Sequence, residues 1–284
     1  MAKTEAGGCR NIVVVSDTHG GCRMGLCRPG GVSLDGGGKY HASRLQGKLW
    51  AHWLDFVRRW VPEVTKREPF ILVHNGDALE GNHHGATTQI SHNLADQGNI
   101  AYDALKELVD KAAVYYHIRG TEAHVGPSGA EEERLARRLG AKPDEDGNHA
   151  RWALWLSLHG HLCHFTHHIG TTGSSSYEAT AVGKEMVENY VESGRWGYRA
   201  AQVIVRSHRH RYYETRHYGV DGLRIAAVTA AFQLKTPFVH RTAARMSEPQ
   251  LGGLLIRKSA SEELHTRAIV YPMRRGKVEV YGVA

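Results

Sequence analysis

A run of apolar residues, 12–15 (IVVV), is followed closely by Asp17 and His19. Such a run predicts a buried strand, and polar residues directly after it predict a site at the carboxyl end of that strand. Two further runs, 70–75 (FILVHN) and 113–118 (AVYYHI), have the same character and are separated from the first by helix-like segments. Strands that alternate with helices predict an α/β fold.

Helix patterns fill the intervals between these runs. Apolar residues at steps of three and four predict an amphipathic helix over 44–61 that ends before Pro62. We expect further helices at 93–112, 131–139 and 177–192. Most of the chain after residue 150 is strand-rich, so we expect the second half to build a second sheet.

Composition bounds the class of protein. With 284 residues and 41% hydrophobic content, the chain predicts one globular domain, residues 1–284. No stretch is long and apolar enough for a membrane span, and the N-terminal apolar run is too short for a signal peptide, so we expect a soluble, cytoplasmic protein without a membrane partner. The cysteines are few and lack the spacing of a zinc knuckle, which favours reduced thiols.

Charge and histidine content point toward phosphate chemistry. The net charge is +7 with a pI near 9.2, an excess that favours polyanionic partners such as nucleic acid. The 20 histidines indicate that some imidazoles serve as metal ligands or as acid/base groups.

Carboxylates and imidazoles recur directly after the predicted strands. They are Asp17 and His19, Asp77 and Glu80, Glu122 and His124, His167 and His168, and His208 and His210. Such ligands, without paired cysteines, suit Mn²⁺, Fe²⁺ or Zn²⁺, and their number suits two ions that share a bridging carboxylate. Each pair alone has an ordinary interpretation, such as a helix cap for Asp17 or a phosphate-contacting basic patch for His208 and His210. Their joint occurrence favours the metal site.

The order Asp-x-His, Gly-Asp, a glycine-led motif, a lone His and then His-x-His resembles the calcineurin-like metallophosphoesterase superfamily, in particular its phage-type and nuclease-like members. The resemblance spans residues 12–210 and includes five short motifs in the family's order. It implies a four-layer α/β/β/α sandwich of two mixed β-sheets flanked by helices.

The resemblance also implies roles for individual residues. Two divalent ions are implied, with Mn²⁺ preferred and Fe²⁺ or Zn²⁺ as alternatives. Asp77 would bridge both ions, and His124 would protonate the leaving group. The remaining ligands would be Asp17, His19 and His210 for the first ion, and His167 and His208 for the second, with His167 chosen over His168 because it lies nearer the strand end.

The chain departs from the family at 120–126 (GTEAHVG), where a Gly-Asn-His motif is usual. Thr121 stands at the asparagine position. Three interpretations remain open: Glu122 replaces the asparagine as a metal ligand with His124 as general acid, His124 alone is retained, or the second metal site is weak. We prefer the first, because a carboxylate binds a divalent ion at least as well as an amide oxygen.

The function expected is dinuclear metal-dependent hydrolysis of a phosphoester through a metal-bridging hydroxide, with a phosphodiesterase or nuclease preferred and DNA or RNA as possible substrates. The alternatives are a phosphomonoesterase of the protein-phosphatase kind and a non-catalytic scaffold that binds metal or nucleic acid. Residues next to the motifs are candidates for substrate binding, namely Arg119, Arg209, His83 and His84.

Overall fold

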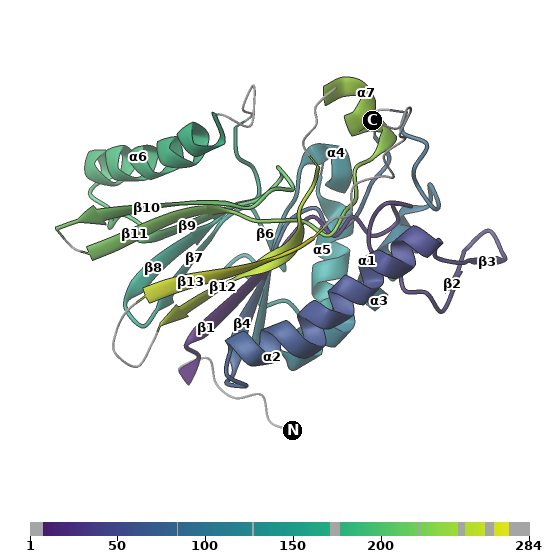
Figure 1. Ribbon diagram of the computed structural model, residues 1–284, viewed down its shortest axis with the longest axis horizontal. Helices are drawn as coiled ribbons and strands as arrows, with labels where there is room; N and C mark the ends of the chain where they lie inside the picture. Colours follow the sequence, from purple (N-terminus) through teal and green to yellow (C-terminus); the bar gives the residue numbers. More distant parts are fainter. Residues whose placement is uncertain are drawn as a thin grey trace, which may run out of the picture.

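Two β-sheets stack face to face, and helices cover both outer sides (Figure 1). The computed structural model describes residues 8–83, 85–126, 128–170, 177–220, 222–243, 248–258 and 264–272. Both sheets mix parallel and antiparallel strands. The predicted four-layer α/β/β/α sandwich is therefore confirmed.

The first sheet has the strand order β13-β12-β1-β4-β5-β6. Its strands are β1 (Asn11–Val15), β4 (Phe70–Asn75), β5 (Val114–Ile118), β6 (Ala150–Arg151), β12 (Leu251–Lys258) and β13 (Leu264–Tyr271). Four of them, from β1 to β6, run parallel, whereas β12 is antiparallel to β1 and β13 is antiparallel to β12. The prediction that the second half builds a separate sheet is thus wrong for β12 and β13, because β12 is buried along its whole length and gains that burial beside β1.

The second sheet has the order β10-β11-β9-β8-β7. Its strands are β7 (Leu154–Leu158), β8 (His161–Phe165), β9 (Val203–Arg206), β10 (Tyr213–Gly219) and β11 (Gly222–Val228). A separate two-stranded ribbon pairs β2 (Val32–Ser33) with β3 (Lys39–Tyr40). Strand β10 is largely exposed and polar, which explains why its sequence carries little strand pattern.

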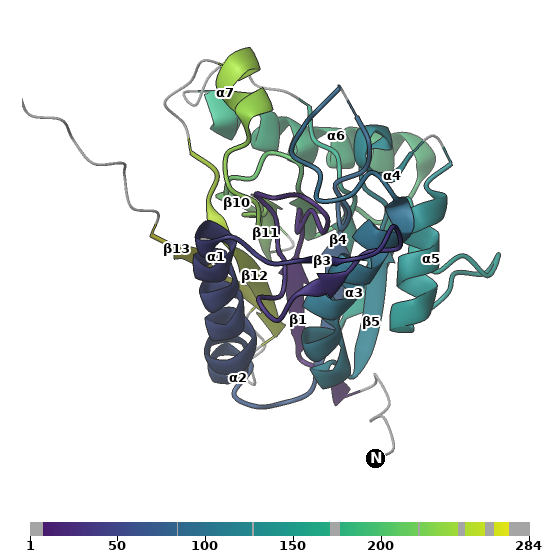
Figure 2. The same cartoon turned by 90° about the vertical axis from the view of Figure 1, so that its right-hand side faces the viewer.

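The helices form the two outer layers. They are α1 (Arg44–Asp55), α2 (Val61–Val64), α3 (Leu94–Lys111), α4 (Glu122–Val125), α5 (Ala130–Leu139), α6 (Glu178–Trp196) and α7 (Pro237–Ala243). Helices α1, α3 and α5 lie in a row across the outer face of the first sheet, as Figure 2 shows, and α6 covers the second sheet. Among the helices of the described residues, none combines the length and apolar character needed to cross a membrane.

Successive side chains of β1 point alternately into two hydrophobic cores. Val13 and Val15 face the helices α1 and α3, whereas Ile12 and Val14 pack against the second sheet. A strand buried on both faces requires a continuous apolar run rather than an alternating one. The run that the sequence shows at 12–15 is therefore a consequence of the position of β1 inside the sandwich.

The first predicted helix continues past Pro62, so its predicted end is wrong. A π-helical turn, Phe56–Trp60, joins α1 to α2, and the Val61 N–H bonds to the carbonyl of Phe56. Pro62 then lies in the first turn of α2, where its missing N–H costs no hydrogen bond. The fourth predicted helix also runs further than expected, to Trp196.

We predict opposite stability effects for two glycine-to-alanine substitutions. A Cβ on Gly253 of β12 would lie 2.7 Å from ring carbons of Phe56, whereas a Cβ on Gly47 of α1 would meet nothing within 4 Å. Gly253→Ala should lower the free energy of unfolding by about 1–3 kcal/mol through overpacking. Gly47→Ala should raise it by about 0.5–1 kcal/mol through helix propensity. Urea unfolding measures both, and effects of the same sign would contradict this packing.

Candidate metal centre

The loops after β1 and β4 remain paired beyond the ends of their strands. The Asp17 N–H donates to the carbonyl of Gly76 at 2.9 Å, and the His19 N–H donates to the carbonyl of Asp77 at 3.1 Å. This pairing continues the parallel register of β1 and β4. It brings Asp17 and Asp77 side by side at the carboxyl edge of the first sheet, as the sequence predicts.

Five of the predicted ligands have a left-handed backbone. Their φ angles lie between 43° and 71°, a region that L-residues other than glycine, asparagine, aspartate and histidine rarely adopt. Such conformations persist only where surrounding contacts enforce them, and they gather at functional sites. The five residues are Asp17, His19, Asp77, His208 and His210.

A chain of hydroxyl groups joins the two sheets beside this edge. The Ser16 and Ser207 hydroxyls each lie 2.7 Å from the hydroxyl of Thr229. The Asn75 side-chain amide donates to Ser207 Oγ at 2.7 Å. Residues after β1, β9 and β11 and at the end of β4 are thereby fixed to one another, which places the loop that carries His208 over the first sheet.

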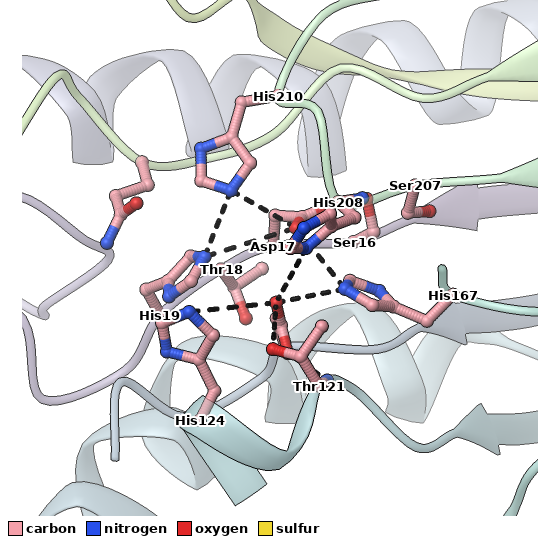
Figure 3. A network of polar contacts seen from close by, with 12 residues as sticks. Ser16, Asp17, Thr18, His19, Thr121, His124, His167, Ser207, His208 and His210 are labelled. Carbon is pink, nitrogen blue, oxygen red and sulfur yellow. Dashed lines mark hydrogen bonds and ion pairs between the residues drawn. The ribbon is translucent and has the colours of Figure 1, made fainter. Parts of the chain in front are cut away.

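Two fully buried carboxylates form the middle of the site. His167 Nε2 lies 2.9 Å from Asp77 Oδ2 and 3.9 Å from Asp17 Oδ1, and His210 Nε2 lies 3.2 Å from Asp17 Oδ1. His208 Nδ1 approaches Asp77 Oδ2 to 3.9 Å. Figure 3 shows these histidines converging from the second sheet on the residues that follow β1.

Three histidines direct the same ring nitrogen to the centre. Nδ1 of His167 lies 2.6 Å from the carbonyl of Asn75, and Nδ1 of His124 lies 2.6 Å from the carbonyl of Glu80. Nδ1 of His19 lies 3.1 Å from the carboxylate of Glu80. Because these oxygens accept hydrogen bonds, each Nδ1 carries the proton in the neutral ring and each Nε2 offers a lone pair to the centre.

In the neutral rings these lone pairs would face other acceptors instead of donors. Asp17 Oδ1 and His167 Nε2 are buried without a hydrogen-bond partner, and His19 Nε2 lies 3.2 Å from His210 Nε2. Acceptors this close repel one another unless positive charge lies among them. Divalent cations satisfy this need, and the nitrogen and oxygen donors suit Mn²⁺, Fe²⁺ or Zn²⁺.

In the described residues the donor atoms form four groups that could hold a metal ion, and two of these groups consist entirely of predicted metal ligands. One comprises Asp17, His19 and His210, and the other comprises Asp77, His167 and His208. The two groups adjoin, because His167 lies near both carboxylates. Both groups consist of residues that the resemblance implies as metal ligands, and Glu122 is in neither of them.

The pKa shifts of His167 and Asp77 show the same need of the buried carboxylates for positive charge. Burial lowers the pKa of His167, but the carboxylates of Asp77 and Asp17 outweigh it and raise the pKa to about 10. Burial also raises the pKa of Asp77, yet the charges of His167 and His124 hold it well below its usual range. Burial is the largest influence on His124 and lowers its pKa to about 4. His124 is therefore neutral near pH 7, with Nε2 free to take a proton.

Thr121, rather than Glu122, contacts the centre. The Thr121 N–H donates to Asp77 Oδ1 at 2.8 Å, and its hydroxyl lies 3.3 and 3.4 Å from the two carboxylate oxygens. Glu122 is the exposed first residue of α4 and belongs to neither of the two groups of metal donors. The preferred interpretation of Glu122 as a ligand is therefore corrected: Thr121, in extended conformation before α4, turns its own side chain onto Asp77 and leaves Glu122 outside.

The predicted substrate-binding residues fall in different places. His83 lies beside His124, with ring centroids 4.5 Å apart. The guanidinium of Arg119 is held by the carbonyls of Ala150 and Ser128, and it does not reach the carboxylates. His84 lies outside the described residues.

Arg209 lies between the two ligands His208 and His210. All three of its guanidinium nitrogens are buried and make no hydrogen bond to the described part of the chain. Burial is also the main cause of a lowered pKa for this guanidinium. The charges of Glu178 and Glu185 act on this guanidinium, but its nitrogens are left able to donate to an anion.

A cavity of about 420 Å³ lies over the metal-binding groups. We call it the first cavity; its walls include His19, Asp77, His124, Arg209 and Phe238 of α7. This volume lies within the range of small-molecule sites. The cavity thus adjoins the candidate ligands, the guanidinium of Arg209 and the ring of His124.

Gln233 and Glu132 are absent from the sequence prediction, and Glu80 appears there only among the polar residues that follow the strands, without a role of its own. Glu80 Oε2 lies 3.1 Å from His19 Nδ1 and accepts the Gln233 side-chain amide at 2.9 Å. Glu132 of α5, fully buried, accepts the N–H groups of Ala78 at 2.8 Å and Gly120 at 2.6 Å. The spacing of Glu80 from Asp77 could have indicated a supporting role, whereas helix periodicity conceals Glu132, which looks like a surface residue of α5.

No family model and no curated protein matches this chain. Among solved structures, Vps29 of Chaetomium thermophilum is similar over 93% of this chain and 96% of its own, with 10% identity and a TM-score of 0.39. A predicted phosphoesterase of Streptococcus pneumoniae is similar over 92% of this chain and 98% of its own, with 10% identity and a TM-score of 0.33. Likenesses with TM-scores below 0.5 do not establish a relationship.

We predict that Glu132 positions the metal ligands. Glu132→Gln places an amide donor against one of the two N–H groups, which frees either the Asp77 loop or the Thr121 loop. Affinity for Mn²⁺ or Zn²⁺, measured by calorimetry, should fall about 10- to 100-fold, as is typical when groups behind metal ligands are lost.

The neighbouring Glu133 provides a matched control. Its carboxylate accepts the N–H groups of His149 and Ala150 in the same manner, but those residues lie at β6 and contact no candidate ligand. Glu133→Gln should therefore reduce stability without changing metal affinity. Equal losses of affinity in both variants would show that Glu132 acts only through general stability.

Proposed function

We propose that this protein is a calcineurin-like metallophosphoesterase that hydrolyses phosphodiesters with two divalent metal ions. The observation that carries the proposal is the convergence of two groups of unpaired donors on the buried pair Asp17 and Asp77, directly beside the unpartnered guanidinium of Arg209. The carboxylates and imidazoles can bind metal cations, and the neighbouring Arg209 guanidinium can bind an anion. A phosphate substrate would contact both.

The metal ligands would be divided between two ions. Asp17, His19 and His210 would hold one ion, and His167 and His208 would hold the other, with Asp77 shared between them. When bound, such ions lower the pKa of a coordinated water and offset negative charge on a phosphoryl group. Mn²⁺ is the preferred ion, and Fe²⁺ or Zn²⁺ would also suit these donors.

Other side chains would act on the substrate directly. Arg209 would bind a phosphoryl oxygen, because its nitrogens have no acceptor of their own. His124 would move a proton at Nε2, since its Nδ1 is engaged with the carbonyl of Glu80. His83, which lines the same cavity, would contact the substrate. The net charge of +7 favours a nucleic acid or another polyanionic diester as the natural substrate.

The direct test compares bis-p-nitrophenyl phosphate with p-nitrophenyl phosphate at several Mn²⁺ concentrations. We expect metal-dependent turnover of the diester that falls by at least about 10³-fold in Asp77→Asn, because the shared ligand loses its charge. Asp110→Asn, an exposed aspartate of α3, should match wild type.

Other outcomes would change the assignment. Faster turnover of the monoester would favour a phosphomonoesterase. Metal binding by calorimetry without turnover of either ester would favour a non-catalytic scaffold, and the absence of metal binding would overturn the proposed site.

The role of His124 can be tested through the leaving group. His124→Gln should lower kcat about 100-fold for thymidylyl-thymidine, whose leaving alkoxide needs a proton, and less than about tenfold for bis-p-nitrophenyl phosphate, whose phenolate does not. Asp110→Asn, on the exposed surface of α3, serves again as the control and should match wild type on both substrates. Equal losses on both substrates in His124→Gln would assign His124 to metal binding or structure instead of proton transfer.

A further inference from the structure

A second hollow adjoins the metal centre beside the first cavity. It is formed by residues that include Thr121, Glu122, Trp152 and His167, and we call it the Trp152 hollow. Thr121 and Ala123 line both spaces. Figure 3 shows Thr121 between His124, which belongs to the first cavity, and His167, which belongs to the Trp152 hollow. The candidate metal ligands thus lie where the two spaces meet.

Trp152 is the large aromatic residue among those that line this hollow. Its side chain is 66% exposed, although it follows directly on β6. The guanidinium of Arg119 lies 5.0 Å from the ring centroid, so one side of the ring rests on a cation. Arg119 is itself anchored by the carbonyls of Ala150 and Ser128. Trp152 is therefore an exposed ring whose movement is limited by its contact with Arg119, which reduces the conformational freedom that it loses when it binds a ligand.

The charges around the hollow favour a neutral occupant. Arg119 lies 3.7 Å from the carboxylate of Glu133 and donates to two carbonyls, so its charge is already compensated. Glu122 adds an exposed carboxylate at the rim. A second phosphate would be repelled there, whereas a flat uncharged ring gains from stacking on Trp152.

We propose that the Trp152 hollow binds an aromatic substituent of a phosphodiester, such as a nucleobase, while the other substituent enters the first cavity. The proposal rests on the phosphoesterase function proposed above. A monoester has one organic group and would fill one of the two spaces, whereas a diester has two groups on either side of phosphorus and fills both. The hollow thereby selects aromatic diesters over monoesters and over diesters without a ring.

Three variants test the hollow. Trp152→Ala removes the ring, and Trp152→Phe keeps a smaller one. Trp196→Ala removes an equally exposed tryptophan, 63% accessible, that lies at the end of α6 and bonds to Glu192. The substrate is bis-p-nitrophenyl phosphate, and dimethyl phosphate serves as a competitive inhibitor that lacks a ring.

We expect Trp152→Ala to raise KM for bis-p-nitrophenyl phosphate about tenfold, the effect of losing one stacked ring. The inhibition constant of dimethyl phosphate should stay within about twofold of wild type, since the phosphate contacts are retained. Trp152→Phe should restore most of the loss, and Trp196→Ala should match wild type. An unchanged KM in Trp152→Ala, or an equal weakening of both compounds, would overturn the proposal.

A binding measurement separates this inference from the proposed activity. If wild type shows no metal-dependent turnover, the binding of thymidylyl-thymidine to Mn²⁺-loaded protein is measured by calorimetry. Weaker binding by Trp152→Ala than by wild type and Trp196→Ala would support the hollow although the hydrolase function had failed. Equal binding by all three proteins, or no binding by any, would overturn the hollow as well.

Discussion

Burial of two neighbouring carboxylates is the constraint on which the rest of this structure depends. Asp17 and Asp77 are fully inaccessible, and burying anions without compensation costs several kcal/mol each. The surrounding imidazoles compensate that charge, and the elevated pKa of His167 is the direct expression of this demand. Two sets of contacts hold cation-binding groups against these anions. One is the hydroxyl chain of Ser16, Thr229 and Ser207, and the other is the set of hydrogen bonds made by the histidine Nδ1 atoms.

The two sheets make different contributions to this arrangement. The first sheet supplies both carboxylates and His19 through paired loops, so their separation is set by the strand spacing of a parallel sheet. The second sheet supplies His167, His208 and His210, which can approach only if the sheets stack in one relative position. The apolar contacts between the sheets and the hydroxyl chain at their edge fix that position, which couples the assembly of the sandwich to the geometry of the site.

The sequence predicted much of this fold because the informative segments are buried on both faces. The runs at 12–15 and 70–73 are apolar throughout and are followed closely by the ligands Asp17 and Asp77, so both strand and site could be inferred from one pattern. The destination of β12 could not be inferred, because a strand that is buried along its whole length shows no preference for either sheet in its sequence pattern.

Within the site, the sequence identified residues that belong to local motifs. It did not identify residues whose role depends on contacts with distant parts of the chain. Asp17-x-His19 and His208-x-His210 are local motifs, whereas the contact of Gln233 with Glu80 joins residues far apart in the chain. The choice between Thr121 and Glu122 depended on where α4 begins, and helix boundaries are the part of a sequence-based prediction that is least well determined.

The left-handed backbone of the ligands has a consequence for how this centre tolerates change. At Asp17, Asp77 and His208 the chain has selected from the few side chains that accept a positive φ, so alanine there would add conformational strain of about 1 kcal/mol to any loss of chemistry. Asparagine tolerates the same conformation and removes only the charge or the imidazole. Alanine scanning would therefore overstate the chemical importance of these positions. The substitutions that the backbone accepts there are asparagine, aspartate, histidine and glycine.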